Sequence, residues 1–260
     1  MNKKPDEMTV LEHLGELRRV LIVSIVATVI LAGVAYYFCD RLLTVLLEPV
    51  TSLGHRIVFT TVTEAFFTKI KFSVFLGFFA ALPVILWQVW SFIMPALKKN
   101  EKPYFTAFVF ISYISFVGGV AFAFFGVYRL AISFLLQFAG SELVPMLTIG
   151  RYISFTIWFL LPFGLIFELP LASFFLAKLG IVTHRFLAKN RKYAFLVVIL
   201  LAAALTPTPD VLTCLLMAGP MYLLFELSVW ITRIVEKAKE RRARQQELTE
   251  LADAQVATKQ

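Results

Sequence analysis

Four acidic side chains stand where carboxylates are costly or unexpected, and they are the residues of this sequence most able to do chemistry. Glu168 is the only charge in the apolar run of residues 152–177, and Glu226 lies in a second apolar run. A carboxylate at membrane depth is unfavourable unless it faces a partner or water, so it indicates a functional site. Glu16 and Glu101 lie instead in short polar segments that are otherwise rich in Lys and Arg.

Glu16 and Glu101 are suited to binding cations. The spacing of Glu12, Glu16 and Arg19 predicts one face of an amphipathic N-terminal helix. Two interpretations stay open: His13 or Arg19 neutralises these acids on a solvated face, or Glu16 binds an external cation. Glu101 either forms a surface ion pair worth under about 1 kcal/mol or is a second carboxylate beside Glu16. Two carboxylates held close together suit bidentate binding of guanidinium groups.

Glu168 is bracketed by Pro162 and Pro170. Each proline lacks a backbone N–H and leaves one helical carbonyl without its partner. Freed carbonyls beside a carboxylate form a polar patch that is tolerable only in a cavity or against protein. Gln88, in another apolar run, either lines such a cavity or packs helices. The alternative function is a proton-coupled small-molecule transporter centred on Glu168, whereas Glu226 needs no more than snorkelling to the interface.

The composition places the chain in a membrane. Hydrophobic residues make up 59% of it, with a mean hydropathy of +0.80, whereas soluble domains have about 45–50% apolar residues. The net charge of +8 flanks the apolar runs, so it indicates membrane topology and no nucleic-acid partner. The sequence lacks nucleophile–base patterns, phosphate-binding loops and zinc spacings, so we expect no enzyme, metal or cofactor. Cys39 and Cys214 either form a disulfide or are small buried thiols.

Six apolar runs predict an all-α integral membrane protein with six transmembrane helices, at residues 20–38, 72–97, 104–128, 152–177, 193–205 and 211–232. Five of them reach about the 20 residues that a spanning helix needs. The fifth in order, residues 193–205, covers only about 20 Å of a core about 30 Å thick. We therefore expect a concave bundle in which short helices five and six form one tight unit around Pro207 and Pro209.

Lys and Arg predict the orientation. The N-terminal segment 1–19, the loops 98–103 and 178–192 and the tail 233–260 hold 19 of the 25 basic residues. The segments 39–71, 129–151 and 206–210 hold the other six. This bias places both termini in the cytoplasm. We expect residues 39–71 to form an ordered outer cap and the polar tail 233–260 to be frayed or disordered. Residues 129–151 either extend the third helix or lie in the membrane interface.

At these residues the chain resembles the TatC family, the polytopic receptor of the twin-arginine protein translocase. The matching pieces include the motifs His13-Leu-Gly-Glu16-Leu-Arg18-Arg19 and Phe167-Glu168-Leu-Pro170, together with residues 48–49, 66–71, 83–97, 101, 191–193, 205–210 and 220–226. They cover all six predicted spans in order. Thr208 departs from the family pattern, in which adjacent prolines precede the Asp, and the long acidic tail of many members is absent.

The resemblance implies a receptor that binds signal peptides of folded exported proteins at the cytoplasmic face of the bacterial cytoplasmic membrane. It implies export driven by the proton-motive force, in an oligomeric complex with TatA- and TatB-type single-span proteins in the lipid bilayer. The residues that match the signal-peptide site are Glu16, Arg18, Arg19, Phe92 and Glu101. Those that match the intramembrane cavity are Gln88, Glu168 and Pro170, and those that match partner contacts are Pro49, Asp210 and Glu226. A purely structural scaffold is the further alternative.

Overall fold

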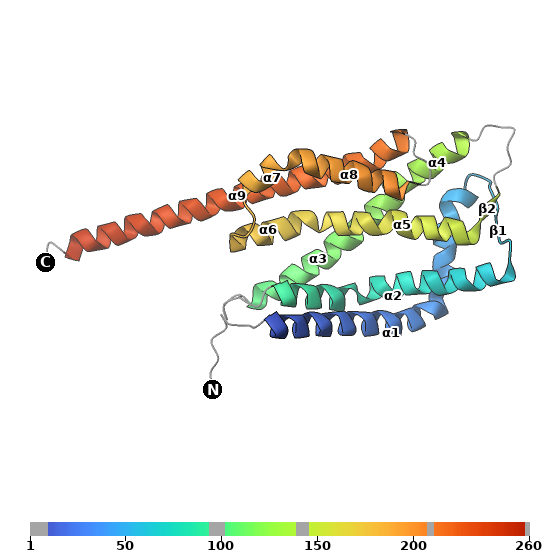
Figure 1. Cartoon of the computed structure of the whole chain (residues 1–260), viewed down its shortest axis with the longest axis horizontal. Helices are drawn as coiled ribbons and strands as arrows, with labels where there is room; N and C mark the ends of the chain where they lie inside the picture. The colour runs from blue at the N-terminus through green and yellow to red at the C-terminus, as the bar shows by residue number, and fades with distance from the viewer. Residues whose placement is uncertain (1–9, 94–101, 139–145, 207–210, 258–260) are drawn as a thin grey trace. The chain divides into compact units, whose positions relative to one another are not determined.

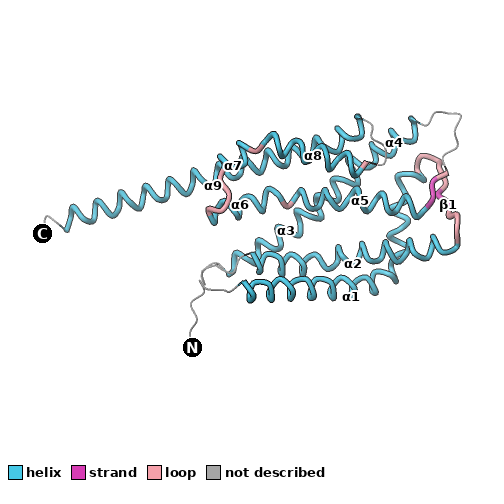
Figure 2. The backbone as a smooth tube through the Cα atoms, in the orientation of Figure 1, coloured by secondary structure: helices cyan, strands magenta, loops and turns pink. Residues whose placement is uncertain are grey.

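The computed structural model describes residues 10–93, 102–138, 146–206 and 211–257, and most of them are helical (Figures 1 and 2). Five helices within these ranges are long and apolar enough to cross a membrane. A sixth apolar helix, α8 (Arg191–Leu205), has only 15 residues. The predicted class, a helical membrane protein with a short fifth span, is confirmed. The chain divides into two compact units, Met1–Pro162 and Phe163–Gln260, called unit 1 and unit 2 below.

Unit 1 is built on two long antiparallel helices that lie side by side in Figure 1. Its elements are α1 (Val10–Thr51), β1 (Ile57–Val58), α2 (Val62–Ile93), α3 (Lys102–Phe122), the π-helix η2 (Ala123–Tyr128), α4 (Arg129–Phe138), β2 (Leu147–Thr148) and the first part of α5 (Ile149–Phe167). The two short strands pair in parallel, with Ile57 opposite Leu147. The end of unit 1 that holds β1, β2 and the first turns of α2 and α5 is called the cap end.

The contact between α1 and α2 depends on Gly77. A Cβ atom at this position would lie 2.4 Å from the backbone nitrogen of Ala32 and 2.5 Å from its Cα. The two backbones therefore approach as closely as only glycine permits, which is the way small residues bring membrane helices together. Gly77 and Ala32 are both buried. This crossing sets the register between the two helices along their whole length.

Helical structure in unit 1 extends beyond the predicted spans. α1 continues past residue 38 to Thr51 and includes Pro49, which lacks the N–H that would bond to the carbonyl of Val45 in the last turns of the helix. The chain then forms β1 and the first turns of α2, so the expected order of segment 39–71 is present. Of the two alternatives for residues 129–151, the structure shows the first for residues 129–138: η2 and α4 follow α3 directly, with Arg129 in α-helical conformation at the junction.

Unit 2 contains the end of α5, α6 (Leu169–Leu179), α7 (His184–Lys189), α8 and α9 (Val211–Ala257). α8 and α6 each pack along α9. Gly180 ends α6 in the left-handed region, with φ of +82°, and its N–H donates to the carbonyl of Ala177. The predicted tight pairing of helices five and six is confirmed as the α8–α9 contact.

The prediction that the tail is frayed or disordered is wrong, because α9 continues as a helix to Ala257. Residues 233–257 contain neither proline nor glycine and are rich in Ala, Glu, Lys, Arg, Gln and Leu, which favour helices. They also extend a helix that is already formed within the apolar segment, so they carry no nucleation cost. Polarity alone was therefore a poor guide to disorder here.

Candidate functional site

Glu16 lies level with the end of α2. Counting sixteen residues back from Ala32 reaches Glu16 on α1, and sixteen residues on from Gly77 reaches Ile93 on α2. Because the helices are antiparallel and cross at that pair, both paths run about 24 Å in the same direction. Glu16 is half-buried, whereas Arg18 and Arg19 are exposed. The equal distances from the crossing thus bring Glu16 to the same end of unit 1 as Phe92.

The Glu16 carboxylate makes no hydrogen bond or ion pair within the described part of the chain. Arg19, one of its two predicted neutralising partners, is exposed and does not bind it. The side chain of the other, His13, lies outside the described residues, as does Glu101. Glu16 is therefore a half-buried acid at this end of unit 1, and its carboxylate oxygens can accept hydrogen bonds from a cationic group.

Trp90 fixes the end of α2 against α3. Its indole nitrogen donates to the Ser112 hydroxyl at 3.1 Å, and its ring meets Phe108 edge to face at 4.6 Å. Both contacts are buried. Phe92, two residues further on, is half-buried in the last turn of α2. The sequence between α2 and α3 contains Glu101. The Trp90–Ser112 hydrogen bond therefore holds together the two helices that precede and follow Glu101.

Glu168 stands at a break between helices in unit 2. It is the N-cap of α6, and Pro170 follows in the first turn. The Glu168 N–H donates to the carbonyl of Leu165 at 3.2 Å, a tighter turn than an α-helix makes. The helix is therefore interrupted directly before Pro170, and Glu168 is half-buried at the junction, while the freed carbonyl expected beside it stays a prediction. Gln88 is half-buried in α2 of unit 1, and its place in a cavity with Glu168 stays a prediction.

Glu226 is paired within unit 2, which the snorkelling interpretation missed. Its two carboxylate oxygens meet Nε and Nη2 of Arg191 at 2.8 and 2.9 Å. The Tyr222 hydroxyl adds a hydrogen bond to Oε1 at 3.1 Å. A signal for this pair was present, since residues 191 and 226 lie at nearly equal distances from the centre of the 206–210 turn. An antiparallel hairpin brings such positions together.

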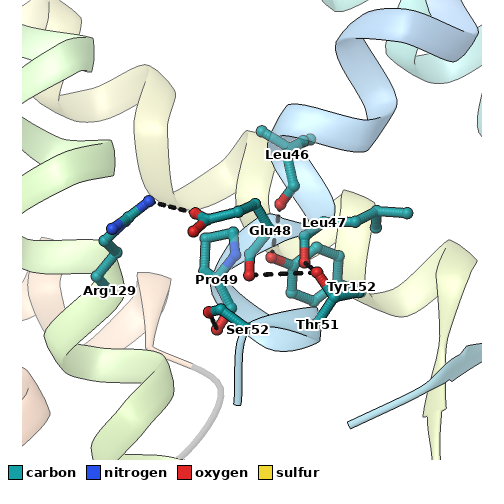
Figure 3. A network of polar contacts seen from close by, with 8 residues as sticks. All are labelled: Leu46, Leu47, Glu48, Pro49, Thr51, Ser52, Arg129 and Tyr152. Carbon is teal, nitrogen blue, oxygen red and sulfur yellow. Dashed lines mark hydrogen bonds and ion pairs between the residues drawn. The ribbon is translucent and has the colours of Figure 1, made fainter. Parts of the chain in front are cut away.

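Pro49 is buried in a polar network at the cap end of unit 1, drawn in Figure 3. The neighbouring Glu48 carboxylate forms an ion pair with Arg129 at the start of α4. The Tyr152 hydroxyl donates to the carbonyl of Leu46 at 2.8 Å. These contacts tie the last turns of α1 to α4 and α5. Of the other two predicted partner contacts, Glu226 is paired as described above and Asp210 lies outside the described residues.

Glu64 is a structural acid at the cap end that no sequence pattern indicated. Its carboxylate accepts hydrogen bonds from the N–H and hydroxyl of Thr60, both at 2.8 Å, and from the N–H of Gly150 at 2.9 Å. It lies about two helical turns before Phe72, where the uncharged part of α2 begins. These donors, the Thr60 N–H first and the Gly150 N–H next, lower its pKa to about 2. Glu64 thereby joins the beginnings of α2 and α5.

The two cysteines are free thiols, Cys39 buried and Cys214 partly buried, so the disulfide alternative is not realised. Cys39 directs its sulfur at the carbonyl of Lys69, 3.7 Å away. Among the described residues no three His, Cys, Asp or Glu side chains gather closely enough to hold a metal ion. The site chemistry of the described residues consists of carboxylates, their cationic partners and hydroxyls.

The chain is similar to known proteins along most of its length. The model of the family described as Sec-independent protein translocase protein (TatC) matches residues 12–220. TatC of Carboxydothermus hydrogenoformans is 52% identical over 236 residues, which cover 91% of this chain and 96% of that protein. TatC of Aquifex aeolicus is 39% identical over 236 residues, covering 89% of this chain and 98% of that protein.

Solved structures agree with this assignment. A crystal structure of the twin-arginine translocase receptor TatC superposes with a TM-score of 0.79 at 38% identity, covering 86% of this chain and all of that one. A second, of the same receptor in the detergent DDM, gives 0.78 at 39% identity. Family model, relatives and structures therefore point the same way, and the chain belongs to the TatC family of Sec-independent protein translocase proteins.

Proposed function

We propose that this chain is the signal-peptide receptor of a twin-arginine translocase in a bacterial cytoplasmic membrane, with both termini in the cytoplasm. It binds the arginine pair of the signal peptide at the end of unit 1 that holds Glu16 and Phe92. With TatA- and TatB-type single-span partners it moves folded proteins across the membrane, driven by the proton-motive force. The observation that carries the proposal is the half-buried Glu16 carboxylate, level with the end of α2 and bound by no described side chain.

A carboxylate in this position is suited to a guanidinium group. Arginine presents parallel N–H donors that match both oxygens of a carboxylate, whereas lysine offers a point charge. Glu101 directly precedes α3 in the sequence, and α3 is held to α2 by the Trp90–Ser112 hydrogen bond. We propose that Glu101 supplies the second carboxylate, so that each arginine of the pair meets one acid. Arg18 and Arg19, both exposed, lie next to Glu16 in the sequence and border the proposed site.

The α8–α9 hairpin is proposed as the docking element for the single-span partners. Its outer face carries exposed apolar side chains on α8, among them Phe195, Leu196 and Leu200 at 48%, 54% and 59% exposure. Such a face, held rigid by the Arg191–Glu226 pair, fits an apolar partner helix in the bilayer. In this proposal Glu226 acts on partner binding through the hairpin that it stabilises, and its carboxylate need not touch the partner.

Site-specific crosslinking tests the receptor role. A twin-arginine signal peptide with a photoreactive group beside the arginine pair is mixed with membranes that contain the chain, and crosslink yield is measured for Glu16→Ala and Glu101→Ala. We expect each variant to lose most of the crosslink, and a peptide with two lysines to crosslink weakly to the wild type. Glu247→Ala, an exposed acid on α9, is the matched control. Undiminished crosslinking and export in both site variants would overturn the arginine-binding role.

A further inference from the structure

The cap end of unit 1 contains a polar cleft that the receptor role does not use. It has a volume of about 720 Å³ and lies between the segment leading into α2 and the beginning of α5. Its polar lining includes Thr60, Glu64, Lys71, Thr148, Arg151 and Ser154. All of these residues belong to unit 1, so the cleft is formed by one compact body.

The cleft carries an excess of positive charge. Lys71 is exposed, and its Nζ atom donates to the Ser154 hydroxyl at 2.8 Å. Arg151 is exposed and makes no hydrogen bond or ion pair with the described residues. The only acid in the lining is Glu64, whose oxygens are already engaged by Thr60 and Gly150. Two cations therefore line the opening together with one carboxylate, and that carboxylate already accepts hydrogen bonds from Thr60 and Gly150 of the same lining.

Both cations stand where the uncharged part of their helix begins. Lys71 directly precedes residues 72–93 of α2, which contain no charged side chain, and Arg151 directly precedes the uncharged residues 152–167 of α5. The α2 segment of 22 residues is about 33 Å long, close to the roughly 30 Å thickness of a bilayer core. Lys71 and Arg151 are thus placed at the level of lipid headgroups. Phe67, which also lines the cleft, is 62% exposed beside them.

We propose that this cleft binds the phosphate of an anionic phospholipid from the leaflet at the cap end. Arg151 offers paired donors to two phosphate oxygens, Lys71 supplies a second charge, and the Thr148 hydroxyl lies within the same lining. Free phosphate shares this chemistry. The headgroup level of both cations and the exposed aromatic ring of Phe67 favour the lipid as its source.

Lipid retention measured by native mass spectrometry tests the proposal. The full chain, purified in neutral detergent, is titrated with phosphatidylglycerol, and the fraction that carries lipid is compared with that of Lys71→Gln, Arg151→Gln and the double variant. We expect each single variant to bind several-fold more weakly and the double variant about tenfold or more. Arg56→Gln is the control, because Arg56 is an exposed cation that directly precedes β1 at the cap end but does not line the cleft. This variant should bind phosphatidylglycerol as the wild type does.

Two further measurements, with phosphatidylcholine and with inorganic phosphate, identify the ligand. Phosphatidylcholine has the same phosphate without net negative charge and should be retained less than phosphatidylglycerol. Millimolar inorganic phosphate should not displace the lipid. Equal retention of phosphatidylglycerol by wild type, cleft variants and Arg56→Gln would overturn the site, and full displacement by phosphate would overturn its assignment to a lipid. If the double variant does not fold, the two single variants decide the same question.

Discussion

Arg191 and Glu226 meet through two parallel contacts, Nε to Oε1 at 2.8 Å and Nη2 to Oε2 at 2.9 Å. The pair joins the first residue of α8 to the second half of the apolar part of α9. An acid that the sequence places alone in an apolar run is therefore neutralised by a cation from the neighbouring helix. The bidentate geometry also fixes how α8 lies along α9, which a single charge–charge contact would not do.

Removing either member of this pair should loosen the hairpin. The two side chains are 47% and 33% exposed, so solvent weakens the pair and we expect a loss of about 1 kcal/mol for Glu226→Gln or Arg191→Gln. For a chain of this size that corresponds to a Tm lower by about 2–4 °C in detergent. The swapped double variant Arg191→Glu with Glu226→Arg should recover part of the loss. Lys189→Gln, an exposed change in α7, is the control, and an equal effect there would contradict the prediction.

Gly77→Ala should separate α1 from α2. The added Cβ would lie 2.4 Å from a backbone atom of Ala32, so the helices themselves must move apart, and we expect a cost of about 1–3 kcal/mol. Loss of the crossing should also weaken signal-peptide crosslinking, because the crossing sets the level of Glu16 against the end of α2. Thermal unfolding and the crosslinking yield measure the two effects.

Two variants sharpen the Gly77 experiment. Gly118→Ala in α3 adds the same methyl group where no atom of another helix lies within 4 Å, so it should leave stability unchanged or raise it slightly through helix propensity. Ala32→Gly should not rescue Gly77→Ala, because the nearest clashes are with the nitrogen and Cα of Ala32 and not only with its side chain. Full rescue by Ala32→Gly would show that the two backbones are not in contact.

Substitutions should show which residue is the donor in the buried hydrogen bond between Tyr128 of η2 and Thr156 of α5. Thr156 donates its single hydroxyl hydrogen to the carbonyl of Tyr152 at 2.8 Å, so Tyr128 must be the donor in the 2.6 Å contact between Tyr128 and Thr156. Thr156→Val would leave the buried Tyr128 hydroxyl without its acceptor, at a cost of about 1–3 kcal/mol. Tyr128→Phe should cost less, and adding it to Thr156→Val should restore stability in part. A double variant less stable than the sum of both would contradict this assignment.

Glu64 should make the cap end sensitive to acid. Its folded-state pKa of about 2 lies below the ordinary 4.5, so its contribution to stability is fully present above about pH 5 and is lost as the pH falls toward 2. The protection factors of the amide hydrogens near Thr60 and Gly150, which compare the observed exchange rate with the intrinsic rate at the same pH, should therefore fall at low pH. In Glu64→Gln these protection factors should be lower already at pH 7 and should depend less on pH. Glu247→Gln, an exposed change on α9, should leave the wild-type profile intact.

The sequence predicts the apolar helices well because a run of about 20 uncharged residues has few other stable structures. It predicts their ends poorly. The end of α1 carries Asp40, Arg41 and Glu48, which suggest a loop, yet Asp40 pairs with Lys69 at 2.6 Å and Glu48 pairs with Arg129. Such pairs stabilise a polar helix end only once the partner helix is in place, so a local pattern cannot show them.

The candidate site was likewise predictable from the sequence only in part. The α1 stripe and the polar loop pointed to Glu16 as a cation ligand, and the structure adds that the Gly77 crossing brings it to the end of α2. Glu64 and Gly150, which form a hydrogen bond, are 86 residues apart in the sequence, and no local pattern indicates that they meet. Contacts of that separation depend on how whole helices pack, and a single sequence does not encode them in any short window.

Glu168 should separate transport from recognition. It lies at the α5–α6 break in unit 2, whereas Glu16 lies in α1 of unit 1. We therefore expect Glu168→Ala to abolish export of a folded twin-arginine substrate while surface crosslinking of the signal peptide stays near the wild-type level. Export into membrane vesicles and crosslinking of the same peptide are measured in parallel, with Glu247→Ala as control. Loss of both together would show that the acid supports peptide binding or folding. Uptake of a small solute by liposomes that contain this chain alone, abolished by Glu168→Gln, would favour a proton-coupled transporter instead.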